Sequence, residues 1–213
     1  MRFQAETNDE MVDALVDRGE IVSSAVEQAF RGVDRADFVP ADAGNPYVDR
    51  PLDIGEGQTI SAPHMVAIIA ERCEFAPGQR VLEVGTGRGY HAAVTAAVVG
   101  AANVWTVERH EALAAAARQN LAAAGLGDVT VVVGDGSTGL PEQAPFDRIY
   151  LTCAAPAVPD ALLEQLAVGG RIVAPVGSAR QTLVSVDEGE DGELLRQEHM
   201  GVRFVQLVGE EGF

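Results

Sequence analysis

Val81-Leu-Glu-Val-Gly-Thr-Gly-Arg-Gly-Tyr90 is the stretch of sequence that decides the fold. A short apolar run with one acidic residue, Glu83, leads into glycines at alternate positions, and an Ala-rich segment follows. Glycine has no Cβ and readily adopts positive φ, so the backbone of such a turn can approach a ligand closely. The next helix would present free N–H groups and the positive end of its dipole. The stretch therefore predicts a strand, a turn and a helix that bind a nucleotide-like ligand.

Strands and helices alternate after this stretch. Strands are expected at 80–84, 103–107, 129–133, 146–152 and 171–175, and helices at 90–99, 112–124 and 159–166. The alternation indicates an α/β fold of the Rossmann-like type, with a mostly parallel, doubly wound sheet. Two late strands at 182–187 and 202–208, around an acidic turn at 188–193, favour an antiparallel edge.

The segment before the glycine turn predicts helices and a loop. Residues 10–31 carry apolar side chains at near-helical spacing, which favours one or two helices. Residues 37–59 are rich in Pro, Gly and Asp and are expected to form a loop, and 62–73 a helix. We expect one domain, 1–213. Its parts are N-terminal helices with a substrate-side loop (1–60), a ligand-binding core (61–178) and C-terminal strands (179–213).

The amino-acid composition limits the kinds of partner that the protein can bind. The chain has 213 residues, 47% of them apolar, which suits one compact domain. Asp and Glu total 32, Lys and Arg total 15, and all 15 cations are arginine, for a net charge of −17. Such a surface repels nucleic acid, so no nucleic-acid partner is expected. The acidic residues are spread along the chain rather than gathered in a tail. This favours a halophilic cytosol, where a Debye length of about 3 Å screens their repulsion.

The location follows from what the sequence lacks. No run approaches 18 apolar residues, so no membrane span is expected. Residues 1–10 are polar and acidic, without the apolar core of a signal peptide, so a cytoplasmic location is expected. The protein is also expected to be a monomer. Cys73 and Cys153 fit no metal or redox spacing, and two buried free thiols are favoured over a disulfide. His91, His110 and His199 show no metal-ligand spacing either and are expected to be solvated or locally bonded, so no metal site is predicted.

The glycine turn discriminates between nucleotide ligands. Residues 87–92 fit the dinucleotide fingerprint with Ala in the last position, a weak signal when it stands alone. A phosphate-binding Walker loop is excluded, because no Gly-Lys-Ser/Thr follows. Glu83, two residues before a Gly-x-Gly-x-Gly turn, is closer to the S-adenosyl-L-methionine fingerprint. Its carboxylate can bond the amino group of that cofactor.

Two further carboxylates follow the next strands. Glu108 ends the second strand, 19 residues after Gly89, and suits a ribose diol. Asp135 follows the third strand in Gly134-Asp-Gly136 and suits the adenine amino group. Any one of these acids can be read as a solvated carboxylate at a strand end. Together they predict a site for S-adenosyl-L-methionine, because ligands of such sheets bind outside the carboxyl ends of the strands.

Longer motifs widen the pattern to residues 34–207. They are Phe38-Val-Pro40, Tyr47-Val-Asp49, Pro51-Leu52, Gly57-Gln-Thr-Ile-Ser-Ala-Pro-His-Met65, Val133-Gly-Asp-Gly136 with Gly139, Ala144-Pro-Phe-Asp147, Gln165-Leu166 with Gly169-Gly-Arg171, Pro175-Val-Gly177 and Phe204-Val205. With these the chain resembles the protein-L-isoaspartate O-methyltransferases, whose fold is a Rossmann-like methyltransferase fold. The segment from Gly57 to Met65 is the most specific. The chain departs from the family at Asp53, Arg88, His91 and Gln206, the last standing where the family usually has Pro.

The resemblance implies repair of damaged proteins by methyl transfer to the α-carboxylate of L-isoaspartyl residues. A carboxylate is already ionised at pH 7, so the reaction needs no general base. The sequence agrees, since no His/Asp or Cys/His dyad is recognisable in it. The task left to the protein is to position two reactants and exclude water.

Site residues follow from the resemblance and the turn. Ser61 is the candidate catalytic residue, whose hydroxyl would orient the carboxylate or a cofactor group. The alternative is that Ser61 only caps the helix at 62–73. Thr59, Ile60, Phe204 and Val205 are expected to bind the peptide. The expected cofactor-binding residues are Ser61, His64, Glu83, Gly85, Thr86, Gly87, Gly89, Glu108, Arg109, Asp135, Gly136, Thr152 and Gln181. For His64 a structural role is an equal alternative.

The sequence is compatible with two other functions. One is a methyltransferase that acts on another carboxylate or on RNA, which the net charge of −17 disfavours. The other is a protein that binds the cofactor without catalysis, which Gln206 leaves open. An isoaspartyl-peptide methylation assay separates the three.

Overall fold

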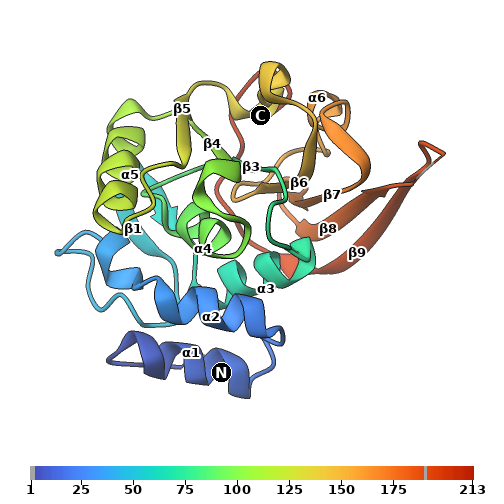
Figure 1. Cartoon of the computed structure of the whole chain (residues 1–213). Helices are drawn as coiled ribbons and strands as arrows, with labels where there is room; N and C mark the ends of the chain where they lie inside the picture. The colour runs from blue at the N-terminus through green and yellow to red at the C-terminus, as the bar shows by residue number, and fades with distance from the viewer. Residues whose placement is uncertain (1–2, 190) are drawn as a thin grey trace.

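A seven-stranded sheet forms the centre of the protein (Figure 1). The computed structural model describes residues 3–189 and 191–213. The strands are β3 (Val81–Val84), β4 (Val104–Glu108), β5 (Thr130–Val133), β6 (Phe146–Leu151), β7 (Leu166–Val176), β8 (Gln181–Glu188) and β9 (Leu194–Val202). Their order across the sheet is β5-β4-β3-β6-β7-β8-β9. The first five strands in this order are parallel to one another, and β8 and β9 each pair antiparallel with the strand before them. The predicted mostly parallel sheet with an antiparallel edge is confirmed.

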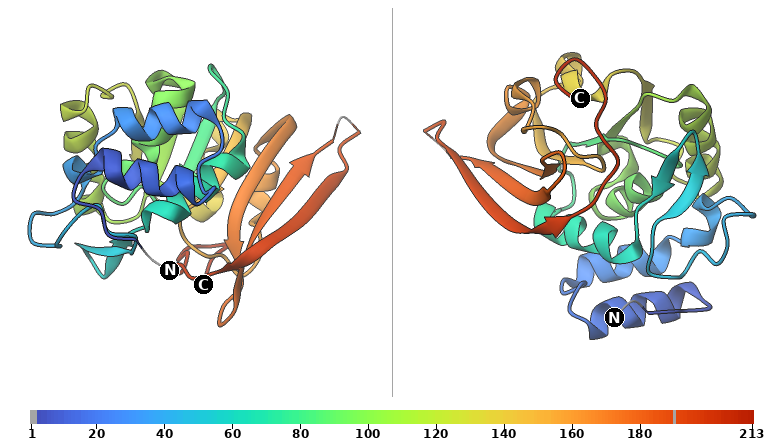
Figure 2. Two further views of the ribbon diagram at one scale, coloured as in Figure 1. Left: turned by 90° about the horizontal axis from the view of Figure 1, so that it is seen from below. Right: turned by 180° about the vertical axis from the view of Figure 1, so that it is seen from behind.

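Helices cover one face of the sheet in two layers. They are α1 (Asn8–Asp17), α2 (Ser24–Gly32), α3 (Pro63–Cys73), α4 (Tyr90–Val99) and α5 (Glu111–Ala123). Helix α4 contacts β4 on one side and α2 on the other, and its residues from Tyr90 to Ala96 are all buried. A helix that is apolar all round belongs in a protein interior, which explains its Ala- and Val-rich sequence. Helices α1 and α2 form the outer layer (Figure 2).

The other face is covered by short elements. They are the 3₁₀ turns Gly136–Thr138 and Pro141–Gln143, helix α6 (Asp160–Leu163) and the C-terminal segment, whose Leu207 is buried. The predicted helix at 159–166 is thus only one turn long. Leu166 already begins β7, so Gly169 and Gly170, where a helix stop could be expected from the sequence, lie within a strand.

Two further predictions about the elements were wrong. The expected loop at 37–59 contains the hairpin β1 (Leu52–Gly55) and β2 (Gln58–Ile60), whose turn uses positive φ at three successive residues, 55–57. The second of the late strands was expected at 202–208, but the observed strand ends at residue 202. Strand β9 runs from 194 to 202, because the turn closes at Gly189 and pairing with β8 starts directly after it. Glu190 in this turn, like residues 1 and 2, lies outside the described residues.

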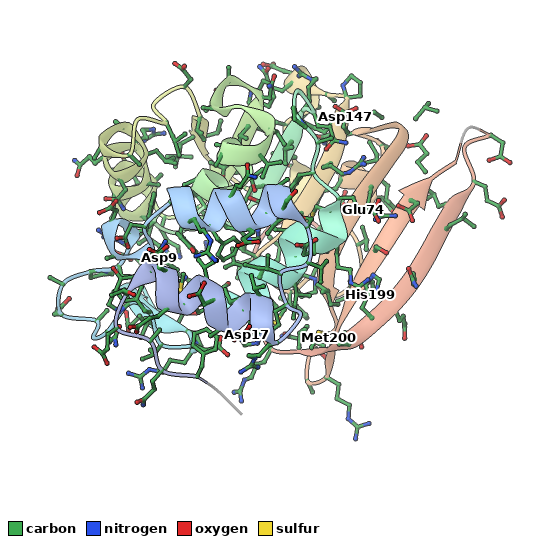
Figure 3. The ribbon with its side chains drawn as sticks, turned by 60° about the horizontal axis from the view of Figure 1, so that its bottom comes forward. Asp9, Asp17, Glu74, Asp147, His199 and Met200 are labelled. Carbon is green, nitrogen blue, oxygen red and sulfur yellow. The ribbon has the colours of Figure 1, made fainter. Side chains whose placement is uncertain are left out.

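The acidic residues lie on many elements, as their spread in the sequence implies. Figure 3 places Asp9 and Asp17 on α1, Glu74 after α3 and Asp147 on β6. The β8–β9 hairpin projects from the body of the molecule (Figure 2) and carries His199 and Met200. In the part of the chain that the structure describes, no helix is long and apolar enough to cross a membrane.

Candidate active site

Three cavities lie at the carboxyl ends of β3, β4 and β6. The glycine-loop cavity is lined by Gly85, Gly87, Glu108, Arg109, Gly136 and Val205, among others. The inner cavity is lined by Ile60, Ser61, Glu83, Thr86, Tyr90 and His91, among others. The outer cavity is lined by Ser61, His64, Met200, Arg203, Phe204 and Val205, among others. Thr59 and Thr152 line all three, so the cavities adjoin one another.

The glycine turn is shaped by its neighbours. Gly85 has a φ of 99°, and a Cβ there would overlap the Thr152 hydroxyl, which donates a 2.6 Å hydrogen bond to the Gly85 carbonyl. Glu108 accepts hydrogen bonds from the N–H of Gly87 at 2.8 Å and of His110 at 2.9 Å. One carboxylate at the end of β4 thus ties together the loops after two strands. Its predicted contact with a ribose stays a prediction.

Gly89 has a different role from the two glycines before it. It begins α4 with a φ of 95°, and a Cβ there would lie 3.2 Å from Cγ of Leu121 on α5. The residue therefore permits α4 and α5 to pack closely, and it is not among the residues that line the three described cavities. Its predicted contact with the cofactor stays untested, and packing alone explains the glycine.

Glu83 is fully buried on β3. Its Oε2 accepts a 2.5 Å hydrogen bond from Thr106, whereas Oε1 has no hydrogen-bond partner among the described residues. Burial in this apolar sheet raises the pKa of Glu83 to about 8. Thr86 in the glycine turn shares a 2.6 Å hydrogen bond with the same Thr106. Glu83 therefore presents one unsatisfied oxygen in the wall of the inner cavity, where a cationic ligand group would stabilise its charged form.

His91 is buried, so the expectation that it is solvated or locally bonded is wrong. Its ring centroid lies 4.4 Å from that of Tyr150, and neither ring nitrogen has a hydrogen-bond partner in the described part of the chain. Burial lowers the pKa of His91 to about 3, so the ring is neutral. The Tyr90 hydroxyl in the same cavity is also buried without a described partner. Buried polar atoms normally have partners, so this cavity is suited to a polar ligand group.

Ser61 lies between the inner and outer cavities and lines both. The interpretation of Ser61 as a helix cap is wrong, because the N-cap of α3 is Ala62, with no side-chain cap bond among the described residues. The backbone of Ser61 is held by Arg35, whose Nη2 donates a 2.7 Å hydrogen bond to the Ser61 carbonyl. Arg35 is fully buried, and its guanidinium lies 4.9 Å from the centroid of the Tyr90 ring.

Arg35 and Asp49 belong to the site but are not among the site residues predicted from the sequence. Arg35 has no local signature, because its partners Pro46 and Ser61 are 11 and 26 residues away. Asp49 is 1% exposed, and its Oδ1 accepts a 3.2 Å hydrogen bond from the backbone N–H of His64 and lies 2.6 Å from Nδ1 of that ring. The expectation of no His/Asp pair was therefore wrong, although the motif ending in Asp49 was part of the resemblance.

The pair has consequences for both residues. Burial alone would raise the pKa of Asp49, but the hydrogen bonds and charge of His64 outweigh it and hold that pKa below its usual range. Among the described cavities His64 lines only the outer one. Its predicted contact with the cofactor stays untested, and its position favours the substrate side.

Asp135 and Gln181 are engaged in holding the C-terminal segment. Asp135 accepts hydrogen bonds from the Ser137 side chain at 2.7 Å and from the Glu210 N–H at 2.7 Å. Burial alone would raise the pKa of Asp135, but these hydrogen bonds outweigh the effect of burial. The pKa of Asp135 is therefore below its usual value. Gln181 binds the backbone N–H and carbonyl of Phe204, at 2.6 and 3.1 Å. Neither residue is among those lining the described cavities, so their predicted roles at the cofactor stay predictions.

Comparison with known proteins agrees with this geometry. The family model of protein-L-isoaspartate(D-aspartate) O-methyltransferase (PCMT) matches residues 6–212. A protein-L-isoaspartate O-methyltransferase of Methanopyrus kandleri is 52% identical over 207 residues, which cover 95% of this chain and 92% of the relative. The enzyme of that name from Methanothermobacter thermautotrophicus is 47% identical over 207 residues, which cover 95% of each chain.

Solved structures give the same result. A Plasmodium falciparum chain assigned as a protein-L-isoaspartate O-methyltransferase, in complex with S-adenosyl-L-homocysteine, superposes with a TM-score of 0.86. It is 25% identical to this chain, and the alignment covers 96% of this chain and 99% of that one. A second protein-L-isoaspartate O-methyltransferase structure gives the same TM-score at 32% identity, over 96% of this chain and 67% of that one. With a family match along nearly its whole length, the chain belongs to the protein-L-isoaspartate(D-aspartate) O-methyltransferase family.

Proposed function

We propose that this protein repairs damaged proteins by moving the methyl group of S-adenosyl-L-methionine to the α-carboxylate of L-isoaspartyl residues. The observation that carries the proposal is the meeting of two family segments at one place. Ser61, from the most specific motif, stands between the inner cavity beside the glycine turn and the outer cavity formed with Phe204 and Val205. The outer cavity, of about 600 Å³, is large enough for a side chain with its flanking backbone.

The residues present fit the cofactor. The glycine-loop cavity combines apolar side chains, among them Ile54, Val107 and Leu207, with the carboxylate of Glu108, a set suited to a flat base and a ribose diol. Oε1 of Glu83, which has no hydrogen-bond partner among the described residues, adds to the inner cavity an acceptor suited to an ammonium group. When bound, S-adenosyl-L-methionine supplies a methyl group activated by its sulfonium charge.

The protein's own contribution is positioning. The substrate carboxylate is ionised at neutral pH, so no residue has to remove a proton from it. The Ser61 hydroxyl donates a hydrogen bond to this carboxylate, and Arg35 holds the Ser61 backbone in place from the buried side. Holding two reactants in line lowers the barrier by several kcal/mol, because the entropy of bringing them together is lost on binding.

Alternative functions have less support. The surface charge of −17 disfavours RNA as a substrate, because phosphate binding requires a basic patch. Gln206 differs from the usual family residue, yet it pairs with Ala154 in an isolated β-bridge and lines the glycine-loop cavity. The departure therefore leaves the wall of the site in place, and loss of catalysis is not favoured.

Composition and charge also bear on where the enzyme works and whether it associates. We infer a cytoplasmic, monomeric enzyme that does not bind nucleic acid and comes from a halophile. Its two cysteines are both free and buried, in keeping with a reducing compartment. Strong net charge opposes association of identical copies, and the lack of lysine and excess of acid suit molar salt.

A methylation assay at molar KCl tests the function. The protein is incubated with methyl-labelled S-adenosyl-L-methionine and one of two peptides that differ only in an L-isoaspartyl or an L-aspartyl residue. We expect label in the isoaspartyl peptide alone. Binding of S-adenosyl-L-homocysteine without transfer to that peptide would instead identify a non-catalytic protein. Equal transfer to both peptides would indicate another carboxylate substrate.

A further inference from the structure

We propose that His64, oriented by the buried carboxylate of Asp49, is the positioning residue that selects an anionic substrate group in the outer cavity, by donating a hydrogen bond from Nε2 to the substrate carboxylate. The inference rests on the proposed function, since it assigns a residue to recognition of the isoaspartyl α-carboxylate. His64 gives up no proton in this role.

The orientation of the ring follows from its contacts. Asp49 is 1% exposed, and its Oδ1 lies 2.6 Å from Nδ1 of His64. An ionised carboxylate only accepts hydrogen bonds, so Nδ1 carries the proton of this contact. Nε2 has no hydrogen-bond partner among the described residues, and the side chain, 24% exposed, lines the outer cavity together with Ser61.

The charges around the ring favour an anion. A histidine ring that donates from both nitrogens is positively charged, and the Asp49 carboxylate lies directly behind this ring. Arg18 lies on the far side of the pair, 4.0 Å from Oδ2 of Asp49, and Arg203 lines the same cavity. Of the described residues that line the outer cavity, none is Asp or Glu.

The outer cavity differs in charge from the other described cavities, each of which has an acidic residue in its lining. The chain has 32 acidic and 15 basic residues, so an approaching carboxylate meets repulsion over most of the surface. The wall of the outer cavity contains His64 and Arg203 and, among the described residues, no acid. A carboxylate that enters this cavity therefore meets no acidic side chain in its lining. The free backbone N–H of His64 in the first turn of α3 explains why Asp49 bonds to it, but it does not require an imidazole ring at the cavity wall.

Two peptides separate recognition from a purely structural role. They are identical except that the isoaspartyl α-carboxylate of one is an α-carboxamide in the other. Binding of each is measured by calorimetry with saturating S-adenosyl-L-homocysteine at molar KCl, for the wild type and for His64→Asn. Asn keeps an amide beside Asp49 but has nothing at the position of Nε2.

The expected result is a change for one peptide only. In His64→Asn, affinity for the carboxylate peptide falls roughly ten- to a hundred-fold, the effect of losing a hydrogen bond to a charged group. Affinity for the carboxamide peptide and for S-adenosyl-L-homocysteine stays the same, and in turnover KM rises more than kcat falls. His64→Gln, whose amide reaches the position of Nε2, recovers part of the loss.

A matched control is His199→Asn, because His199 bonds Ser185 on the β8–β9 hairpin and is not among the residues lining the outer cavity. It should behave as wild type. Equal weakening of both peptides in His64→Asn, or an unchanged preference for the carboxylate, would overturn the inference. A wild-type protein that methylates no isoaspartyl peptide would instead overturn the proposed function.

Discussion

Glu83→Gln should remove one component of the pH dependence of stability. Burial raises the pKa of Glu83 from its usual 4.5 to about 8. The folded protein therefore binds this proton more tightly than the unfolded chain. Its contribution to stability is complete below pH 4.5 and is lost as the pH rises through about 8. At about 1.36 kcal/mol for each pH unit, the loss amounts to about 3–5 kcal/mol.

A neighbouring histidine acts in the opposite direction. Burial lowers the pKa of His91 from 6.5 to about 3, so its contribution is present above pH 6.5 and is lost as the pH falls toward 3. In the wild type the two effects offset each other between pH 4.5 and 6.5, and of these two residues only Glu83 acts above that range. Subtracting the wild-type curve from that of Glu83→Gln cancels the histidine.

The measurement is urea unfolding at constant molar KCl, at pH 5, 6, 7 and 8, for the wild type and Glu83→Gln. The free energy of unfolding of the variant, relative to the wild type, should rise across this series by about 3–5 kcal/mol. Glu142→Gln, at an exposed carboxylate, is the control and should show no such rise. If Glu83→Gln and the wild type follow parallel curves, the buried carboxyl is not protonated as inferred.

Three further predictions concern the catalytic role of Ser61, the backbone conformation at Gly85 and the dependence of stability on salt. Ser61→Ala should slow methylation roughly ten- to a hundred-fold and leave the melting temperature unchanged, because Ser61 does not cap α3; a loss of stability with full activity would contradict this. Gly85→Ala should lose about 2–4 kcal/mol in urea unfolding and bind S-adenosyl-L-homocysteine weakly in calorimetry, because its φ of 99° and the Thr152 hydroxyl leave no room for a Cβ; normal binding would show that this turn is not the site. The melting temperature should rise from low to molar KCl as carboxylate repulsion is screened, and a flat or falling curve would count against a halophilic origin.

The sequence alone determined the features that arise from neighbouring residues. The glycine turn, the strands beside it and the helix after it are specified within 81–99, by apolar runs and by positions that need positive φ. Because the carboxyl ends of parallel strands share one edge, it also followed that Glu83 and Glu108 approach the same turn. Local patterns of this kind need no knowledge of the rest of the chain.

Only the tertiary structure decided which distant side chains meet. Asp49 and His64 are 15 residues apart, and Arg35 is 26 residues from Ser61, so neither contact has a sequence period that would reveal it. The same holds for the late strands, where β9 lies at 194–202 because pairing across a tight turn, not local propensity, sets its register. His91 follows the glycine turn on a helix that looks uniformly apolar, and its burial depends on α4 lying between the sheet and α2. Long-range packing thus set the polar contacts that orient Ser61 and His64, since their partners come together only when the chain has folded.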